Sequence, residues 1–257
     1  MNGLRLFAVV AALSAAVACS GQKEAAPNAA PANARRVDES KAGTVIGRVA
    51  VEGTVPANTA LKLEGDSYCA SQNPNGAMSE SYVVDNGGLK NVFVYVKDGL
   101  GDYGFDVPAE PIKLDQLGCQ YRPHVLGIQV GQKLVIANSD DTVHNVHMMG
   151  NANGGWNKGQ ALKNMSDEKV FKSREVMVPF KCDVHNWMRA YVGVMEHPYF
   201  AVTHDGGTFE LKNLPAGTYT IEAWHEKLGT QTQSVTLGEK ESKQVSFTFK
   251  APAASSN

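Results

Sequence analysis

Three side chains that can bind a metal stand close together in one short stretch of the chain. The run 180–188 reads FKCDVHNWM and holds Cys182, His185 and Met188 within seven residues. The spacing C-x2-H-x2-M suits a tight loop between two strands, because the cysteine ends one strand and the methionine begins the return. We therefore expect a thiolate, an imidazole and a thioether to face one point.

A fourth donor has to come from another part of the chain, and His144 is the candidate. It lies just beyond the apolar run Leu134–Ala137, where a strand is expected to end. A thiolate, two imidazoles and a weak axial thioether compromise between the geometries that Cu+ and Cu2+ prefer. The set predicts one copper ion. Cysteine and two histidines also suit zinc, but the methionine favours copper.

At these residues the sequence resembles the cupredoxins, the small type 1 copper proteins, and the short ligand loop is most like that of amicyanin. The resemblance extends upstream to Tyr121–Asn138 and covers about residues 108–197. It implies a Greek-key β-sandwich in which Asn145 ties the two ligand loops together and supports the thiolate. It assigns four copper ligands: His144, Cys182, His185 and Met188.

More soft side chains follow the first histidine directly. His147, Met148 and Met149 offer a possible second, copper-loading site. The alternative is that they are strand and loop residues beside the metal.

The N-terminal residues 1–18 have the layout of an export signal. Arg5 precedes the apolar run Leu6–Ala18, which has small residues at its end and is too short to span a membrane. Ala16–Cys19 resembles a bacterial lipobox, which would make Cys19 the lipid-bearing first residue of the mature chain. The alternative is cleavage nearby, with Cys19 removed or left free. Either reading predicts export. With the lipobox, we expect the cell envelope of a bacterium, at the periplasmic face or as an outer membrane lipoprotein.

Export also bears on the remaining cysteines. In an oxidising compartment Cys69 and Cys119 are expected to form a disulfide. That pairing leaves Cys182 as an odd thiol, which independently supports its role as a metal ligand.

The rest of the chain has an all-β pattern. Residues 19–43, rich in Ala, Pro and Asn, are typical of a flexible tether, and residues 251–257 of a disordered tail. One short helical or irregular excursion is expected at 158–169. Strands are expected at 45–51, 91–96, 125–130, 134–137, 176–180, 191–194, 218–224 and 246–249.

The segment Thr203–Trp224 resembles the carboxypeptidase regulatory-like domain, a small transthyretin-like β-sandwich. That family begins with strands like 45–51 and 91–96, which here precede the copper segment. We therefore expect a cupredoxin at 108–197 inserted into a second sandwich made of 44–107 and 198–250. The alternative is a larger cupredoxin at 44–197 followed by a C-terminal domain.

These features predict an exported one-electron carrier that is not an enzyme. No esterase, phosphate-loop or zinc-protease motif is found, and 24 basic against 26 acidic residues show no nucleic-acid patch. We expect the outer edge of His185 near the surface as the electron exit, with Trp187 in the docking patch for a haem or copper protein. The alternatives are a copper chaperone or storage protein, and a carbohydrate- or protein-binding sandwich with a vestigial metal site.

Overall fold

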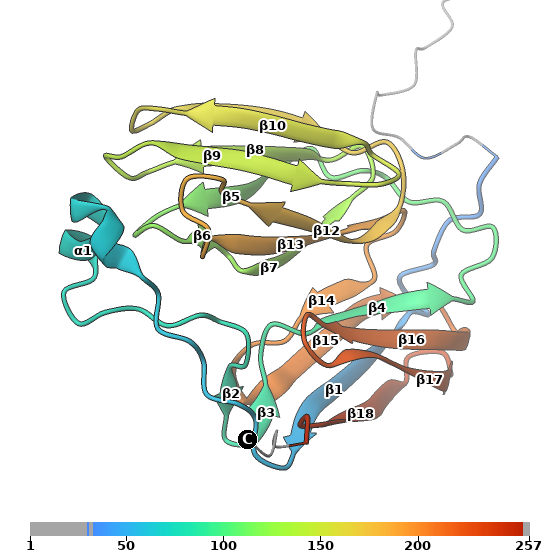
Figure 1. Ribbon diagram of the computed structural model, residues 1–257. Coiled ribbons are helices and arrows are strands. Elements are labelled where there is room, and N and C mark those ends of the chain that lie inside the picture. The colour runs from blue at the N-terminus through green and yellow to red at the C-terminus, as the bar shows by residue number, and fades with distance from the viewer. Residues whose placement is uncertain (1–29, 31–32, 254–257) are drawn as a thin grey trace, which may run out of the picture.

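The computed structural model describes residue 30 and residues 33–253, and this part of the chain is built almost entirely of β-strands (Figure 1). The all-β class predicted from the sequence is confirmed. The predicted export signal, Cys19 and about half of the predicted tether lie outside the described residues. In the described part, no helix combines the length and apolar character needed to cross a membrane.

One β-sandwich contains strands from both ends of the described chain. Its strands are β1 Gly43–Glu52, β2 Val84–Asp85, β3 Gly88–Leu89, β4 Phe93–Asp98, β14 Phe200–Val202, β15 Thr208–Leu214, β16 Gly217–His225, β17 Gly229–Leu237 and β18 Ser242–Lys250. One sheet has the order β15-β1-β3-β2, with β18 also paired to β1, and the other has the order β14-β4-β16-β17. We call this unit the outer sandwich.

The outer sandwich follows the alternation expected of half-buried strands. Along β15, Phe209 and Leu211 point inward, and along β18, Phe247 and Phe249 do the same. β1 pairs antiparallel with β15 and parallel with β18, while β4 pairs with β14 and β16. Segments that precede and follow the middle of the chain therefore lie in the same sheets.

The middle of the chain forms a second sandwich, which we call the inner sandwich. Its strands are β5 Ile112–Gln116, β6 Tyr121–Arg122, β7 Val125–Gln129, β8 Lys133–Asn138, β9 His144–Met149, β10 Gly155–Gln160, β11 Ser166–Val170, β12 Glu175–Lys181 and β13 Arg189–Met195. Two sheets, ordered β10-β9-β12-β13-β7 and β11-β8-β5-β6, enclose a separate apolar core.

The prediction of a short helical or irregular segment at 158–169 is wrong for both ends of that range, which belong to strands. Residues 158–160 belong to β10, which pairs with β9, and residues 166–169 belong to β11, which pairs with β8. Both strands lie at the edges of their sheets and expose most of their side chains. Their sequences therefore lack the apolar alternation that reveals a strand.

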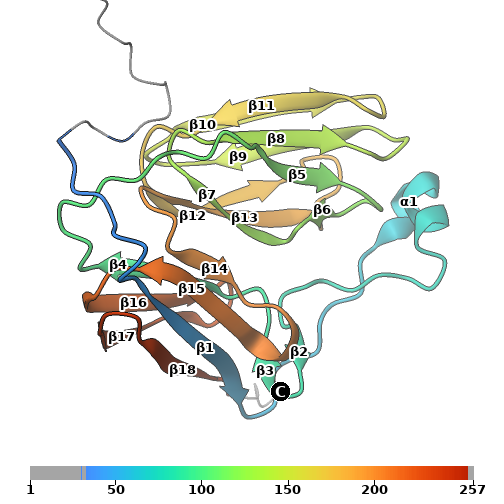
Figure 2. The same cartoon turned by 180° about the vertical axis from the view of Figure 1, so that it is seen from behind.

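The two sandwiches lie one above the other (Figure 2). Apolar side chains, including Phe93, Val125 and Met195, fill the interface between them. Gly127 of β7 pairs with Gly193 of β13. Because neither residue has a side chain, aromatic rings can approach the backbone of the inner sandwich at this point. Phe200 packs on the first and Phe93 on the second. At another point His124 of the inner sandwich contacts the carboxylate of Glu226, a residue of the outer one.

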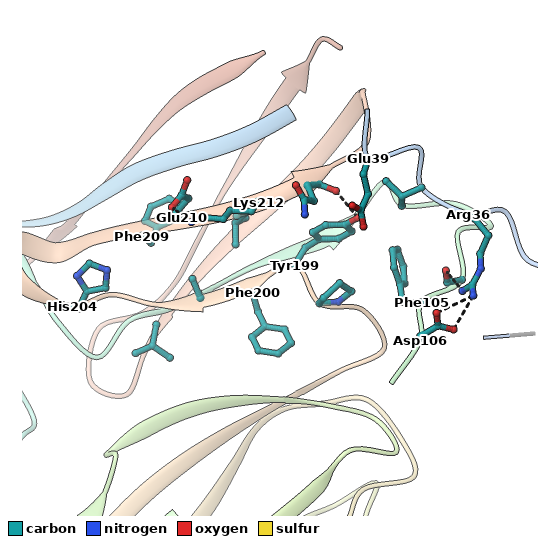
Figure 3. A pocket seen from close by; sticks show the side chains of 17 residues that line it. Arg36, Glu39, Phe105, Asp106, Tyr199, Phe200, His204, Phe209, Glu210 and Lys212 are labelled. Atoms are coloured by element: carbon teal, nitrogen blue, oxygen red, sulfur yellow. Dashed lines mark hydrogen bonds and ion pairs between the residues drawn. The ribbon is translucent and has the colours of Figure 1, made fainter. Parts of the chain in front are cut away.

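A hollow lies on the outer sandwich beside β14 and β15 (Figure 3). Its rim includes Arg36, which forms a two-pronged ion pair with Asp106 at 2.9 Å. Arg35 also stacks on the ring of Tyr103. Residues 35 and 36, which were expected to belong to a flexible tether, thus lie against the connection between β4 and β5. Among the described residues, none that lines this hollow belongs to a group able to hold a metal.

Candidate metal centre

The predicted ligands come from two neighbouring strands of the inner sandwich. His144 opens β9, and Cys182 directly follows β12, which pairs with β9 through Lys181 and His147. The loop 182–188 folds back on itself, since the amide of Cys182 donates to the carbonyl of Met188 at 3.3 Å. The sheet therefore fixes which side chains can meet.

The structure brings three of the four predicted ligands into one buried cluster. The ligand atoms of His144, Cys182 and His185 all lie within 4.8 Å of one another. The Nδ1 atoms of the two histidines are 2.9 Å apart. Met188 is also buried, packs in the same core as Cys182, and donates its amide to the carbonyl of His185 at 2.9 Å.

The surroundings favour the ionised thiol. Burial alone would raise the pKa of Cys182, but hydrogen bonds from His144 and His185 outweigh it and lower this pKa to about 6. The amide of His185 also donates to the sulfur at 3.3 Å. A thiolate is the form of cysteine that binds a metal, so the site is prepared for one.

Each histidine is held on its far side by a carboxylate. Nε2 of His144 lies 2.9 Å from Oδ2 of Asp140, and Nε2 of His185 lies 3.2 Å from Oδ2 of Asp66. These contacts place the ring proton on Nε2 and leave the Nδ1 lone pairs for a metal. Sequence reasoning missed both carboxylates, because Asp66 is remote in the chain and neither lies in a recognisable motif.

The contact between Asp140 and His144 stabilises the charged form of both side chains. Burial alone would raise the pKa of Asp140, but hydrogen bonds from His144 and from the amides of Cys119 and Gly118 hold it below its usual value. Burial alone would lower the pKa of His144, but its contact with Asp140 keeps it above the ordinary value. The imidazole and the carboxylate therefore act as one hydrogen-bonded unit.

A cap covers the centre from outside the inner sandwich. It consists of the 3-10 turn η1 Leu63–Gly65 and helix α1 Ser67–Gln72, which stand on the arm between β1 and β2 and lie beside one end of the inner sandwich (Figures 1 and 2). A disulfide between Cys69 and Cys119 joins the cap to that sandwich, as the export argument predicts.

The cap corrects one expectation about the electron exit. The outer edge of His185 was expected near the surface, but this residue is only 3% exposed. Asp66 and the sulfur of Cys69, 3.7 Å away, cover its Nε2 edge. Trp187 is half-buried, with its ring 5.0 Å from that of His185 and its indole N–H donating to the carbonyl of Cys119 at 3.0 Å.

Asn145 connects the two ligand segments. Its Oδ1 accepts the amide of Asp183 at 2.9 Å, and its amide group contacts Asn157 of β10. The position directly after His144 thus faces the position directly after Cys182. This tie limits independent movement of the two ligands.

The structure does not bring together the residues considered for a second metal site. Strand β9 alternates, so Met148 enters the core while His147 and Met149 face the other side. His147 contacts the carboxylate of Asp183 at 2.9 Å. A joint site of His147, Met148 and Met149 is therefore wrong, because consecutive side chains of a strand point to opposite faces.

No protein-family model matches the chain, and none of the curated proteins matches it. Among solved structures, the Cu(I) form of an amicyanin mutant is 22% identical, covering 34% of this chain and 85% of that one with a TM-score of 0.30. A purple cupredoxin from Nitrosopumilus maritimus is 20% identical, covering 32% and 98% of the two chains with a TM-score of 0.28. The copper-containing nitrite reductase from Thermus scotoductus SA-01 is 15% identical, covering 39% and 26% with a TM-score of 0.33. At this level of likeness, the ligand assignment stands on the geometry of the site alone.

Proposed function

We propose that the chain is an exported protein that holds one copper ion and carries single electrons in the bacterial envelope. The observation that carries this proposal is the convergence of Cys182, His144 and His185, with both Nε2 edges already taken by carboxylates. This donor set fits copper, because a thiolate and two imidazoles suit both of its oxidation states. Met188 is the fourth candidate ligand, and copper bound here would supply one-electron exchange.

The chain's own contribution is to hold the ligands still. All four ligand side chains are buried, and Asn145 and the closed loop 182–188 tie the two ligand segments together. Ligands held in this way would give a bound copper ion similar surroundings in both oxidation states, which would lower the energy of reorganisation during electron transfer. The cap adds to this effect by keeping water from the Nε2 edge of His185.

Because His185 is buried, electrons need a route to the surface that does not pass through its outer edge. Trp187 offers it, since its ring lies against His185 and it also lines a hollow together with Met78 and Arg189. Met78 is 51% exposed at that hollow. We propose that a haem or copper protein docks there, while Cys19 carries the lipid anchor.

An absorption spectrum of the copper-loaded, oxidised protein tests the site. An intense visible thiolate band is expected, and Cys182→Ser should abolish it. Cys119 and Cys69 supply no such band while they are joined, so the variant is specific. Purification with stoichiometric zinc from a medium that contains both metals would reject the copper assignment.

A second measurement separates a carrier from a chaperone. A carrier should pass through repeated one-electron reduction and oxidation without losing copper. Release of the ion on each reduction would instead identify a copper chaperone. The burial of Met148 in the core argues for the carrier, because it removes one donor of the possible copper-loading cluster.

A further inference from the structure

The disulfide of the cap lies among groups that could bind a metal on the outer side of the first centre. Asp66, Cys69 and His185 offer ligand atoms within 4.8 Å of one another, and so do Cys119, Asp140 and His144. The two sulfurs of one disulfide are thus each placed beside one histidine and one carboxylate. A disulfide itself is a poor ligand, whereas two thiolates bind soft cations strongly.

We propose that reduction of Cys69–Cys119 turns the cap into a second metal site, in which the two thiolates hold a Cu+ ion. Nε2 of His185 lies 3.7 Å from Sγ of Cys69 but keeps its hydrogen for Asp66, so the two thiolates are the ligands. A dithiol is the reductant: it gives two electrons and two protons to the disulfide and becomes a disulfide itself. The two thiol protons leave when Cu+ binds.

The carboxylates keep both cysteines in place after the bond is broken. Oδ1 of Asp66 accepts the amides of Tyr68 at 2.8 Å and Cys69 at 3.1 Å, which caps α1. Asp140 accepts the amides of Gly118 and Cys119, both at 2.7 Å. Each carboxylate therefore fixes the backbone of one cysteine with contacts that do not depend on the disulfide.

The backbone spacing suits two thiolates on one ion. The Cα atoms of Cys69 and Cys119 are 5.6 Å apart. Metal–sulfur bonds of about 2.3 Å allow sulfurs up to about 4.6 Å apart across a metal, a separation shorter than that of the two Cα atoms. Cys69 and Cys119 are also fully buried, and Trp187 packs on them, so a bound Cu+ would be shielded from water.

The test counts Cu+ ions bound by the full chain under anaerobic conditions, in competition with the chromophoric chelator bicinchoninate. The oxidised chain should bind one ion. After reduction by a phosphine, which is then removed, the chain should bind two. Reduced Cys182→Ser should still bind one ion in the cap, so a failure of the first site does not conceal the second.

Alkylation of the reduced wild-type chain with iodoacetamide then locates the second ion without a variant. Cu+ should slow modification of Cys69 and Cys119 by at least about tenfold, because a metal-bound thiolate is a poor nucleophile. The matched variant with both Cys69→Ser and Cys119→Ser should bind one ion whether or not the reductant has been used. A reduced chain that binds no more Cu+ than the oxidised one, or that leaves Cys69 and Cys119 unprotected, would overturn the proposal.

Discussion

At the scale of single residues, two aspartates hold the histidines of the candidate centre in place. Asp140 comes from the segment that leads into β9, whereas Asp66 comes from the cap, well before the inner sandwich begins. Each bonds Nε2 of a histidine through one oxygen and accepts main-chain amides through the other or through both. The orientation of the ligands is therefore set by residues from two parts of the chain.

The variant Asp140→Asn should weaken copper binding by about 10–100-fold, as is usual when a carboxylate behind a histidine ligand is removed. An asparagine at this position keeps one acceptor but cannot accept from both His144 and the amides of Gly118 and Cys119. The affinity would be measured by competition with a chelator. The matched control is Asp141→Asn, which alters an exposed neighbour and should leave the affinity unchanged. Equal losses in both variants would show that general charge, not the contact with His144, controls binding.

The cluster of His144, Cys182 and His185 could be predicted from the sequence, but the aspartates that support it could not. Cys182, His185 and Met188 lie within one loop, and His144 follows an apolar strand, so their types and spacing carry the signal. Asp66 reaches His185 across a sequence separation of 119 residues. No spacing reveals such a contact, because only the folded arm of the cap creates it.

At the scale of elements, strand alternation decides which predictions succeed. Every strand predicted from β-branched and aromatic residues overlaps a strand of the structure, since these residues fill the cores of the two sandwiches. The edge strands β10 and β11 were missed because they expose polar side chains. The same alternation separates Met148 from His147, although the two residues are neighbours in the sequence.

The connection from β13 to β14 contains a histidine, His197, that should make the folded state less stable at acid pH. Nε2 of His197 donates to the carbonyl of Val96 at 2.9 Å, and its Nδ1 accepts the amide of Tyr199 at 3.2 Å. Burial, with a contribution from Arg174, lowers the pKa of His197 from 6.5 to about 4. The unfolded chain binds this proton more readily, so the stabilisation is complete above pH 6.5 and is lost as the pH falls toward 4.

The metal-free wild type should therefore lose about 2 kcal/mol more unfolding free energy than His197→Gln between about pH 7.5 and 5. Glutamine keeps a donor for the carbonyl of Val96 but does not titrate. Urea unfolding at each pH measures the difference. His204→Gln, at an exposed position, should follow the wild type. A His197→Gln curve parallel to that of the wild type would contradict the assignment.

At the scale of the whole molecule, the inner sandwich contacts both the outer sandwich and the cap. The inner sandwich holds the ligands, and the arm from the outer sandwich supplies Asp66 and Cys69. The cluster that includes Phe93, Val125 and Met195 joins the sandwiches on another side. Neither sandwich alone would present the centre in the form seen here, because the cover of His185 comes from outside the unit that holds it.

The paired glycines at the interface allow this joint to be tested. A methyl group on Gly193 would meet the ring of Phe93 at 2.4 Å, whereas one on Gly159 of β10 would meet nothing within 4 Å. Gly193→Ala should therefore lower the unfolding free energy by about 1–3 kcal/mol, the usual cost of overpacking a well-filled core. Gly159→Ala should have little effect or stabilise slightly, since alanine suits a strand better than glycine. Urea unfolding of both variants, followed by tryptophan fluorescence, provides the comparison. The copper-loaded spectrum of Gly193→Ala should stay that of the wild type, because the ligand loop lies at the other end of β13. Equal unfolding free energies for the two variants would show that the sandwiches do not depend on the contact between Gly193 and Phe93.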